Sequence, residues 1–205
     1  MSITIRGQVG PQVLTDGTEQ PFRLGKTGET IVTELQARYF EQVYRGNCFT
    51  AVSAAATSSA GLNATYTGGC VVSNPASSNK ILVVLKASSA MTVISTAVTT
   101  AGVFAGWSQA GVVTHTTALT PTSLLLGSQL PSIGKADQAA TLPGTPAYVI
   151  AGFASTGIAA GMFGAAIDLE GLVVVPPGGY CGVATSIASA ATAMICSMTW
   201  CEVPA

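Results

Sequence analysis

The sequence predicts an all-β protein, a jelly-roll-like antiparallel β-sandwich that follows an extended N-terminal arm. From Cys48 onward, short apolar runs rich in β-branched residues alternate with clusters of glycine, proline, serine and asparagine, which is typical of strands and their turns. The length of 205 residues suits one all-β domain, and no internal repeat stands out. The expected strands are NCFTAVSAA, ATYTGGCVVSN, KILVVLKASSAMTVIS, GVFAGW, GVVTHTTAL, AYVIAGFA, GLVVVPP, YCGVATSI and MICSMTWCEV.

The first 28 residues differ from the rest of the chain. Turn signals at three places exclude a long helix or an unbroken central strand: Gly10-Pro11, Asp16-Gly17 and Gln20-Pro21. One short strand is expected at Ile3–Arg6. Apolar residues are nonetheless spaced along the segment, and we expect these seven to bind a partner: Ile3, Ile5, Val9, Val13, Leu14, Phe22 and Leu24. The sequence thus predicts an arm over residues 1–28 and a single β-sandwich domain over residues 29–205.

Residues 29–45 are compatible with a helix or with a strand. A helix is favoured over residues 33–45, because apolar residues then share one face and the pairs Glu34/Arg38 and Glu41/Arg45 stand at i,i+4 spacing. Gly46 would cap that helix. The β-branched residues of TIVTELQ favour the alternative, a strand.

The stretch GLVVVPPGGYCGV, residues 171–183, predicts a strand, a corner and a returning strand. Three valines suit a pleated strand, whereas Pro176 and Pro177 cannot donate to a sheet ladder. Pro177 followed by Gly178 suits the central pair of a type II turn, so the strand is expected to turn at the rim of the sandwich.

Two further segments are expected to be loops. Residues 73–80, SNPASSNK, form a connection in which Asn74-Pro75 starts a turn. Residues 123–146 are rich in turn residues and are expected to form a long loop suited to contact with a partner.

Charged side chains are scarce, at 8% of the chain against about 25% in typical soluble domains. Ten of the seventeen lie in residues 1–45, which leaves the expected sandwich almost uncharged. The formal net charge of −1 gives no basic surface for nucleic acid. A free monomer with so neutral a surface would be poorly soluble, so we expect either a membrane or a protein assembly to cover it.

The candidate for a membrane span is residues 147–167, which have about the length of a spanning helix. The segment is dominated by small residues and lacks flanking lysine, arginine or aromatic belts, so its insertion would be weak. We therefore expect no membrane partner and instead a homo-oligomer, with three copies the expected number. The N-terminus has no apolar stretch of the kind found in signal peptides, so synthesis and assembly in the cytoplasm are expected. In that reducing compartment all five cysteines are expected to be unpaired: Cys48, Cys70, Cys181, Cys196 and Cys201.

No group of residues indicates catalysis. His115 is the only histidine, and its valine and threonine neighbours favour a satisfied or surface residue on a strand. Asp168 and Glu170 share one strand face, which is expected to face solvent. Cys196 and Cys201 point to opposite faces of a strand and have no second ligand pair nearby, which disfavours zinc. The chain is expected not to be an enzyme and to use no metal, cofactor or small-molecule substrate.

Three segments resemble regions of virion structural proteins of tailed bacteriophages. RLGKTGETIVTELQARYFEQVYRGNCFTAV, residues 23–52, resembles their N-terminal region. VVSNPASSNKILVVLKASSAMTV, residues 71–93, is similar to their Asn-Pro … Lys-Ala segment. GLVVVPPGGYCGVATS and MICSMTWCEVPA, within residues 171–205, resemble their Pro-Gly-Gly corner and closing Thr-Trp strand, with Cys201 where an acidic residue is expected.

The resemblance implies a capsid cement or decoration protein of jelly-roll fold that binds the major capsid protein on the surface of the virion. It leaves open a component of the tail, the neck or a head fibre. An alternative from another class is a carbohydrate-binding jelly-roll module for host attachment. Such a module usually presents exposed aromatic residues beside polar groups, and the available tryptophans are Trp107 and Trp200.

Overall fold

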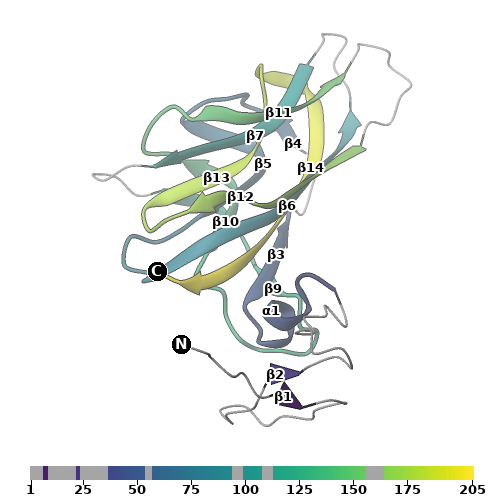
Figure 1. Ribbon diagram of the computed structural model, residues 1–205. Coiled ribbons are helices and arrows are strands. Elements are labelled where there is room, and N and C mark those ends of the chain that lie inside the picture. Colours follow the sequence, from purple (N-terminus) through teal and green to yellow (C-terminus); the bar gives the residue numbers. More distant parts are fainter. Residues whose placement is uncertain are drawn as a thin grey trace, which may run out of the picture. The chain divides into compact units, whose positions relative to one another are not determined.

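The computed structural model describes residues 7–8, 22–23, 37–53, 57–93, 99–107, 113–155 and 164–205. The chain divides into two compact units, Met1–Phe40 and Glu41–Ala205. In the first unit, β1 (Gly7–Gln8) pairs in parallel with β2 (Phe22–Arg23). The second unit holds the two sheets that Figure 1 shows.

A short helix, α1 (Phe40–Tyr44), precedes the sheets. Gly46 has a φ of 72° and caps it, with its N–H donating to the Val43 carbonyl at 2.9 Å. Arg45 pairs with Glu41 at 2.6 Å, four residues apart. The expected helix is therefore confirmed over Phe40–Tyr44 and wrong over residues 37–39, since Ala37 has a φ of 150° that no helix allows. Residues 33–36 lie outside the described residues.

Two antiparallel sheets form the sandwich, so the prediction of an all-β fold is confirmed. One sheet, called here the β13 sheet, has the order β11-β7-β13-β5-β10-β8. Its strands are β5 (Thr65–Ser73), β7 (Thr99–Trp107), β8 (Thr114–Leu119), β10 (Lys135–Thr141), β11 (Ala147–Ser155) and β13 (Gly179–Thr185). The other, called the β14 sheet, has the order β12-β6-β14-β3-β9, with β4 also paired to β14. Its strands are β3 (Cys48–Val52), β4 (Thr57–Ser59), β6 (Lys80–Val93), β9 (Thr122–Ser123), β12 (Gly164–Val175) and β14 (Ser189–Pro204).

The inner core fills the space between the sheets, because alternate side chains of each strand point inward. Trp200 of β14 is fully buried there, and its ring centroid lies 6.4 Å from that of Phe49 on the neighbouring β3. The other large members of this core come from both sheets: Val72, Leu82, Val84, Met91, Val103, Val175, Val183, Met194 and Met198. The closing strand expected around Trp200 is thus confirmed as β14, and its tryptophan lies in the inner core.

A second, smaller apolar cluster lies on the outer face of the β13 sheet. Val71 belongs to it, whereas its neighbours Cys70 and Val72 belong to the inner core, so Val71 points to the opposite face. Tyr66 is the largest member; its ring lies 5.3 Å from that of Phe104, and its hydroxyl donates to the Val183 carbonyl at 2.6 Å. Side chains of the β13 sheet are therefore buried on part of both of its faces.

The corner at residues 171–183 is confirmed. β12 ends at Val175 in the β14 sheet, and β13 begins at Gly179 in the β13 sheet. The Gly179 N–H donates to the Pro176 carbonyl at 2.8 Å, and Gly178 has the positive φ, 82°, that a type II turn needs at that position. The chain crosses from one sheet to the other at this turn.

The expectation of a long loop over residues 123–146 is wrong for part of its length, because Lys135–Thr141 form β10. This strand lies between β5 and β8 and makes antiparallel ladders with both. The sequence KADQAAT lacks large β-branched residues other than its final threonine, so the strand depends on its neighbours rather than on its own propensity.

A buried carboxylate anchors the segment before β10 to the end of β14. Glu202 lies on the same face of β14 as Trp200 and is almost fully buried. Its Oε1 accepts hydrogen bonds from the Ser132 hydroxyl at 2.6 Å and from the N–H groups of Ile133 at 2.8 Å and Gly134 at 3.0 Å. Its Oε2 accepts from Lys80 Nζ at 2.9 Å. Every oxygen of this charge is thus paired inside the protein.

The expectation that all five cysteines are unpaired is wrong for two of them. Cys48 of β3 stands directly opposite Cys201 of β14, with Cα atoms 4.0 Å apart, and the two form a disulfide. They lie on the face opposite that of Phe49 and Trp200, since adjacent side chains alternate. Cys70, Cys181 and Cys196 are free and buried.

No helix within the described part of the chain is long and apolar enough to span a membrane.

Candidate functional site

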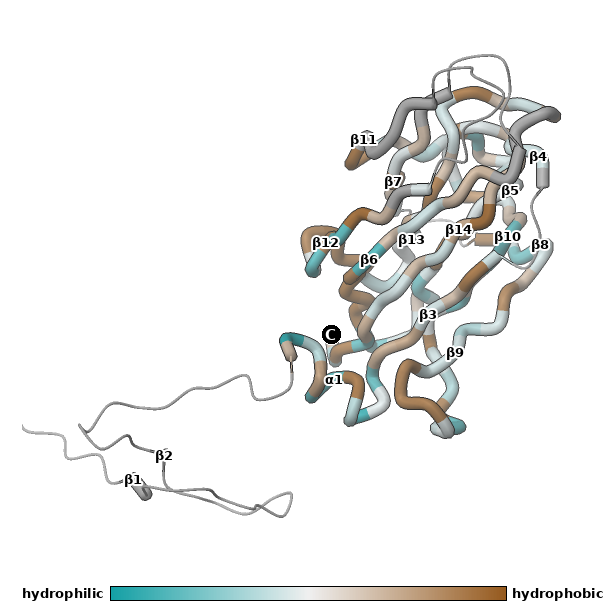
Figure 2. The backbone as a smooth tube through the Cα atoms, turned by 90° about the vertical axis from the view of Figure 1, so that its right-hand side faces the viewer, coloured by the Kyte–Doolittle hydropathy of each residue, from teal (hydrophilic) through white to brown (hydrophobic). Residues whose placement is uncertain are grey.

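The outer face of the β14 sheet exposes many side chains but little charge. We call it the β12–β14 face and define it by its exposed outward-pointing residues: Val52, Lys86, Ala90, Ala166, Asp168, Leu172, Val174 and Ile195. In Figure 2 the strands that carry them, β12, β6, β14 and β3, lie side by side. Its large apolar side chains form two groups, Val52 with Ile195 and Leu172 with Val174, on either side of Lys86 along β6. Apolar side chains exposed on one face are typical of surfaces that contact another protein.

The charges on this face neutralise each other. Lys86 Nζ lies 3.2 Å from Asp168 Oδ1, and both side chains are at least half exposed. Such a pair contributes only about 1 kcal/mol or less to stability. Lys86 and Asp168 together add no net charge to the β12–β14 face, and the exposure of Asp168 agrees with its predicted solvent-facing position. Glu170, which was expected beside Asp168, is also exposed.

A bulge in β12 sets the position of the most exposed member. The pairing register of β12 with β6 shifts between Asp168 and Val173, and Glu170 and Gly171 within the shift have φ values of 49° and 89°. Leu172 follows the bulge and is 77% exposed. A leucine so exposed on a strand gains from burial against a partner.

A shallow pocket of about 470 Å³ lies on this face, between residues of β3, β6, β12 and β14. Its lining contains no ionisable side chain other than Cys196: Val52, Ser88, Ser89, Ala90, Gly164, Ala166, Ile195, Cys196 and Ser197. Ser88 and Ser197 hydrogen-bond to each other through their hydroxyls at 2.6 Å, which leaves fewer polar atoms to bind water. The described lining of this pocket is therefore uncharged, while the ion pair of Lys86 and Asp168 lies outside it.

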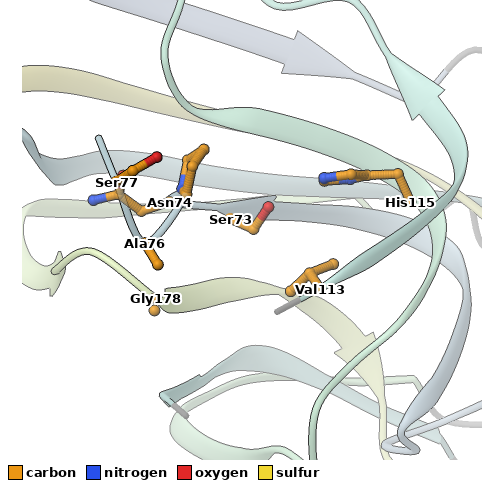
Figure 3. Close-up of a pocket in the computed structure, with 9 residues that line it drawn as sticks. Ser73, Asn74, Ala76, Ser77, Val113, His115 and Gly178 are labelled. Carbon is orange, nitrogen blue, oxygen red and sulfur yellow. The ribbon is translucent and has the colours of Figure 1, made fainter. Parts of the chain in front are cut away.

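A second pocket, of about 390 Å³, lies beside β8 and is shown in Figure 3. His115 and Val113 line one wall. The turn after β5 and the corner before β13 supply the rest of the lining: Ser73, Asn74, Pro75, Ala76, Ser77, Gly178 and Gly179. Residues far apart in the sequence therefore meet here.

His115 is held by a buried carboxylate that the sequence gave no reason to single out. Its Nδ1 lies 2.6 Å from Oδ2 of Asp137 on β10, and Asp137 is fully buried. Burial raises the pKa of Asp137, and the hydrogen bond and charge of His115 partly offset that rise. Two register shifts between β8 and β10 place the two residues near each other on one face. The expectation of a satisfied or surface histidine agrees with this arrangement, since His115 is 43% exposed on its side chain.

The seven arm residues expected to bind a partner lie almost entirely outside the described residues. Only Phe22 is described, in β2, where its backbone pairs with Gly7. Ile3, Ile5, Val9, Val13, Leu14 and Leu24 are not among the described residues, so their role stays a prediction.

The described residues contain no cluster of three histidine, cysteine or acidic side chains that could hold a metal ion. Comparisons of the chain with protein-family models, with curated proteins and with solved structures find no match.

Proposed function

We propose that this chain is a structural component of a bacteriophage virion, a capsid cement or decoration protein that binds and stabilises the major capsid protein lattice as a homo-oligomer. The observation that carries the proposal is the β12–β14 face, where apolar side chains surround one neutralised ion pair. The sequence resemblance to virion structural proteins supports the same assignment.

The physical argument concerns the cost of leaving this face in water. Full burial of one exposed leucine or valine side chain is worth about 1.5–3 kcal/mol, and four such side chains stand on the face: Val52, Leu172, Val174 and Ile195. Interfaces between identical subunits are more apolar than ordinary surface and are depleted in charge at their centre. The face is largely apolar, and Lys86 and Asp168 within it neutralise each other, so a permanent protein contact suits it better than exposure.

The chain is expected to form a homo-oligomer through this face, with a mass in solution of about three times 20.5 kDa. Replacing Leu172 with aspartate should shift the mass toward that of one chain, because a buried unpaired carboxylate opposes association. Multi-angle light scattering after gel filtration measures this. Thr116→Asp is the matched control, since Thr116 is exposed on β8 in the other sheet. A wild-type monomer at micromolar concentration contradicts the oligomer.

The location is tested by cryo-electron microscopy of virions purified from the source of this chain. Density for the β-sandwich in many copies on the head surface is the expected result. Density confined to the tail, neck or a fibre would replace the capsid assignment by a tail or fibre assignment. Absence of the chain from purified virions would overturn the proposal.

The arm is expected to strengthen attachment to the virion. Deleting residues 1–24 removes the seven spaced apolar residues but leaves every strand of the two sheets intact. The truncated chain should keep the circular dichroism and unfolding transition of the full chain while binding particles more weakly, because it loses those apolar contacts. Co-sedimentation with particles stripped of this chain measures the difference. Equal affinity of the two chains would show that the arm has no anchoring role.

A further inference from the structure

We propose that the pocket beside β8 is a binding site for an uncharged saccharide unit, with His115 as its principal polar contact. The proposal concerns the outer face of the β13 sheet and does not rest on the assembly role of the β12–β14 face. It stands on three observations: the fixed orientation of His115, the unpaired acceptor of Asn74, and the size and neutrality of the pocket.

The imidazole of His115 is fixed by its partner. Nδ1 of His115 lies 2.6 Å from Asp137 Oδ2, and when the carboxyl is ionised Oδ2 can only accept, so Nδ1 then carries the shared proton. The other ring nitrogen, Nε2, then accepts a hydrogen bond when the imidazole is neutral and donates one when it is protonated. Figure 3 shows the ring extending from β8 toward Ser73 and Asn74 on the opposite side of the pocket. The fully buried carboxylate of Asp137 thus fixes the orientation of the half-exposed His115 ring, which an unpaired surface histidine would not have.

The opposite wall holds a second fixed acceptor. Asn74 is 3% exposed, and its amide Nδ2 donates to the carbonyl oxygens of Lys80 at 2.7 Å and Val175 at 2.9 Å. These two bonds set the amide orientation and leave Oδ1 buried with no partner in the described structure. An unsatisfied buried acceptor costs stability unless something donates to it. Asn74 lines the pocket, so a ligand hydroxyl that reaches Oδ1 would supply such a donor.

The remaining lining suits the alternating character of a sugar ring. Ser73 and Ser77 add hydroxyl groups that can donate or accept, while Pro75, Ala76 and Val113 add apolar surface for ring C–H groups. A volume of about 390 Å³ falls within the usual range of small-molecule pockets. His115 is the one lining residue that can carry a charge, so phosphates and carboxylates lack a cationic cluster to hold them. The described lining holds no phenylalanine, tyrosine or tryptophan, so the contact with ring C–H groups falls to these aliphatic side chains instead of the aromatic residues usual in carbohydrate-binding modules. A neutral, hydroxyl-rich ring fits these walls.

The test uses the fact that His115 is the only histidine of the chain, so its imidazole gives single, self-assigned NMR signals. Long-range ¹⁵N–¹H spectra of the full chain should first show the Nδ1–H tautomer. D-glucose, D-galactose, D-mannose and N-acetyl-D-glucosamine are then titrated into the millimolar range. At least one should shift the imidazole signals along a saturating curve. Signals unmoved by all four sugars would overturn the proposal.

Variants separate this site from other contacts. His115→Gln keeps a donor for Asp137 but removes the Nε2 acceptor, and it should weaken binding of the active sugar roughly tenfold, as saturation-transfer NMR of the sugar reports. Ser77→Ala changes a second wall without touching Asp137 and should also weaken binding. Thr114→Ala is the matched control on the same strand, exposed and outside the pocket lining, and should bind as the wild type does. Unchanged binding by both pocket variants would place the sugar elsewhere and overturn the proposal.

Discussion

Replacing Glu202 with alanine is expected to lower the free energy of unfolding by about 3–5 kcal/mol. The carboxylate is almost fully buried and accepts from Ser132, Ile133, Gly134 and Lys80. Its removal leaves the N–H groups of Ile133 and Gly134 without this acceptor, while the Ser132 hydroxyl keeps the Gly134 carbonyl at 2.9 Å. Urea unfolding followed by tryptophan fluorescence measures the loss, since Trp200 lies two residues away in the core.

The dependence of the free energy of unfolding on pH, below neutrality, tests the same interaction independently. Burial alone would raise the pKa of Glu202, but the hydrogen bonds from Ser132, Gly134 and Lys80 outweigh it, and the pKa lies below its ordinary value of 4.5. The stabilisation is therefore complete above that ordinary value and is lost as the pH falls through the folded-state pKa. Glu202→Gln should flatten this acid loss relative to the wild type.

Asp168→Ala is the matched control for Glu202→Ala. Asp168 also pairs with a lysine, but its side chain is 68% exposed, so its removal should cost about 1 kcal/mol or less. Equal destabilisation by the two alanine variants would show that the hydrogen bonds to Glu202 do not stabilise the fold.

Removing the Cys48–Cys201 disulfide is expected to cost about 2–5 kcal/mol, near the upper end, because it closes a loop spanning 153 residues. Replacing both cysteines with alanine should lower the urea midpoint to a value close to that of the reduced wild type. Reductant should lower the urea midpoint of the wild type and leave that of the double variant unchanged. The double variant is thus the control for other effects of the reductant.

Alkylation tests the pairing directly. Under denaturing, non-reducing conditions, three thiols should react, those of Cys70, Cys181 and Cys196, and five should react after reduction. Burial raises the pKa of Cys181 and of Cys196 to about 12, so labelling of the folded protein should be slow. Five labelled thiols without reductant, in protein purified in air, would contradict the disulfide.

Most of the strands could be predicted from the sequence because their signals are local. The valines before Pro176, the turn at Gly178 and the β-branched run of β6 act within a few residues, and each of the expected runs overlaps a strand. β10 was missed because Lys135–Thr141 carry almost none of those signals. Ladders with β5 and β8 on its two sides supply the hydrogen bonds that make it a strand.

The candidate sites also depend partly on local sequence and partly on contacts between distant residues. The sequence by itself determined an almost uncharged body of β-strands. Only the tertiary structure decided which residues meet: Asp137 reaches His115 across 22 residues, Lys80 reaches Glu202 across 122, and Cys48 reaches Cys201 across 153. The physical reason is that strand order, register and bulges set these contacts, and they follow from the packing of the whole sandwich rather than from any local run of residues.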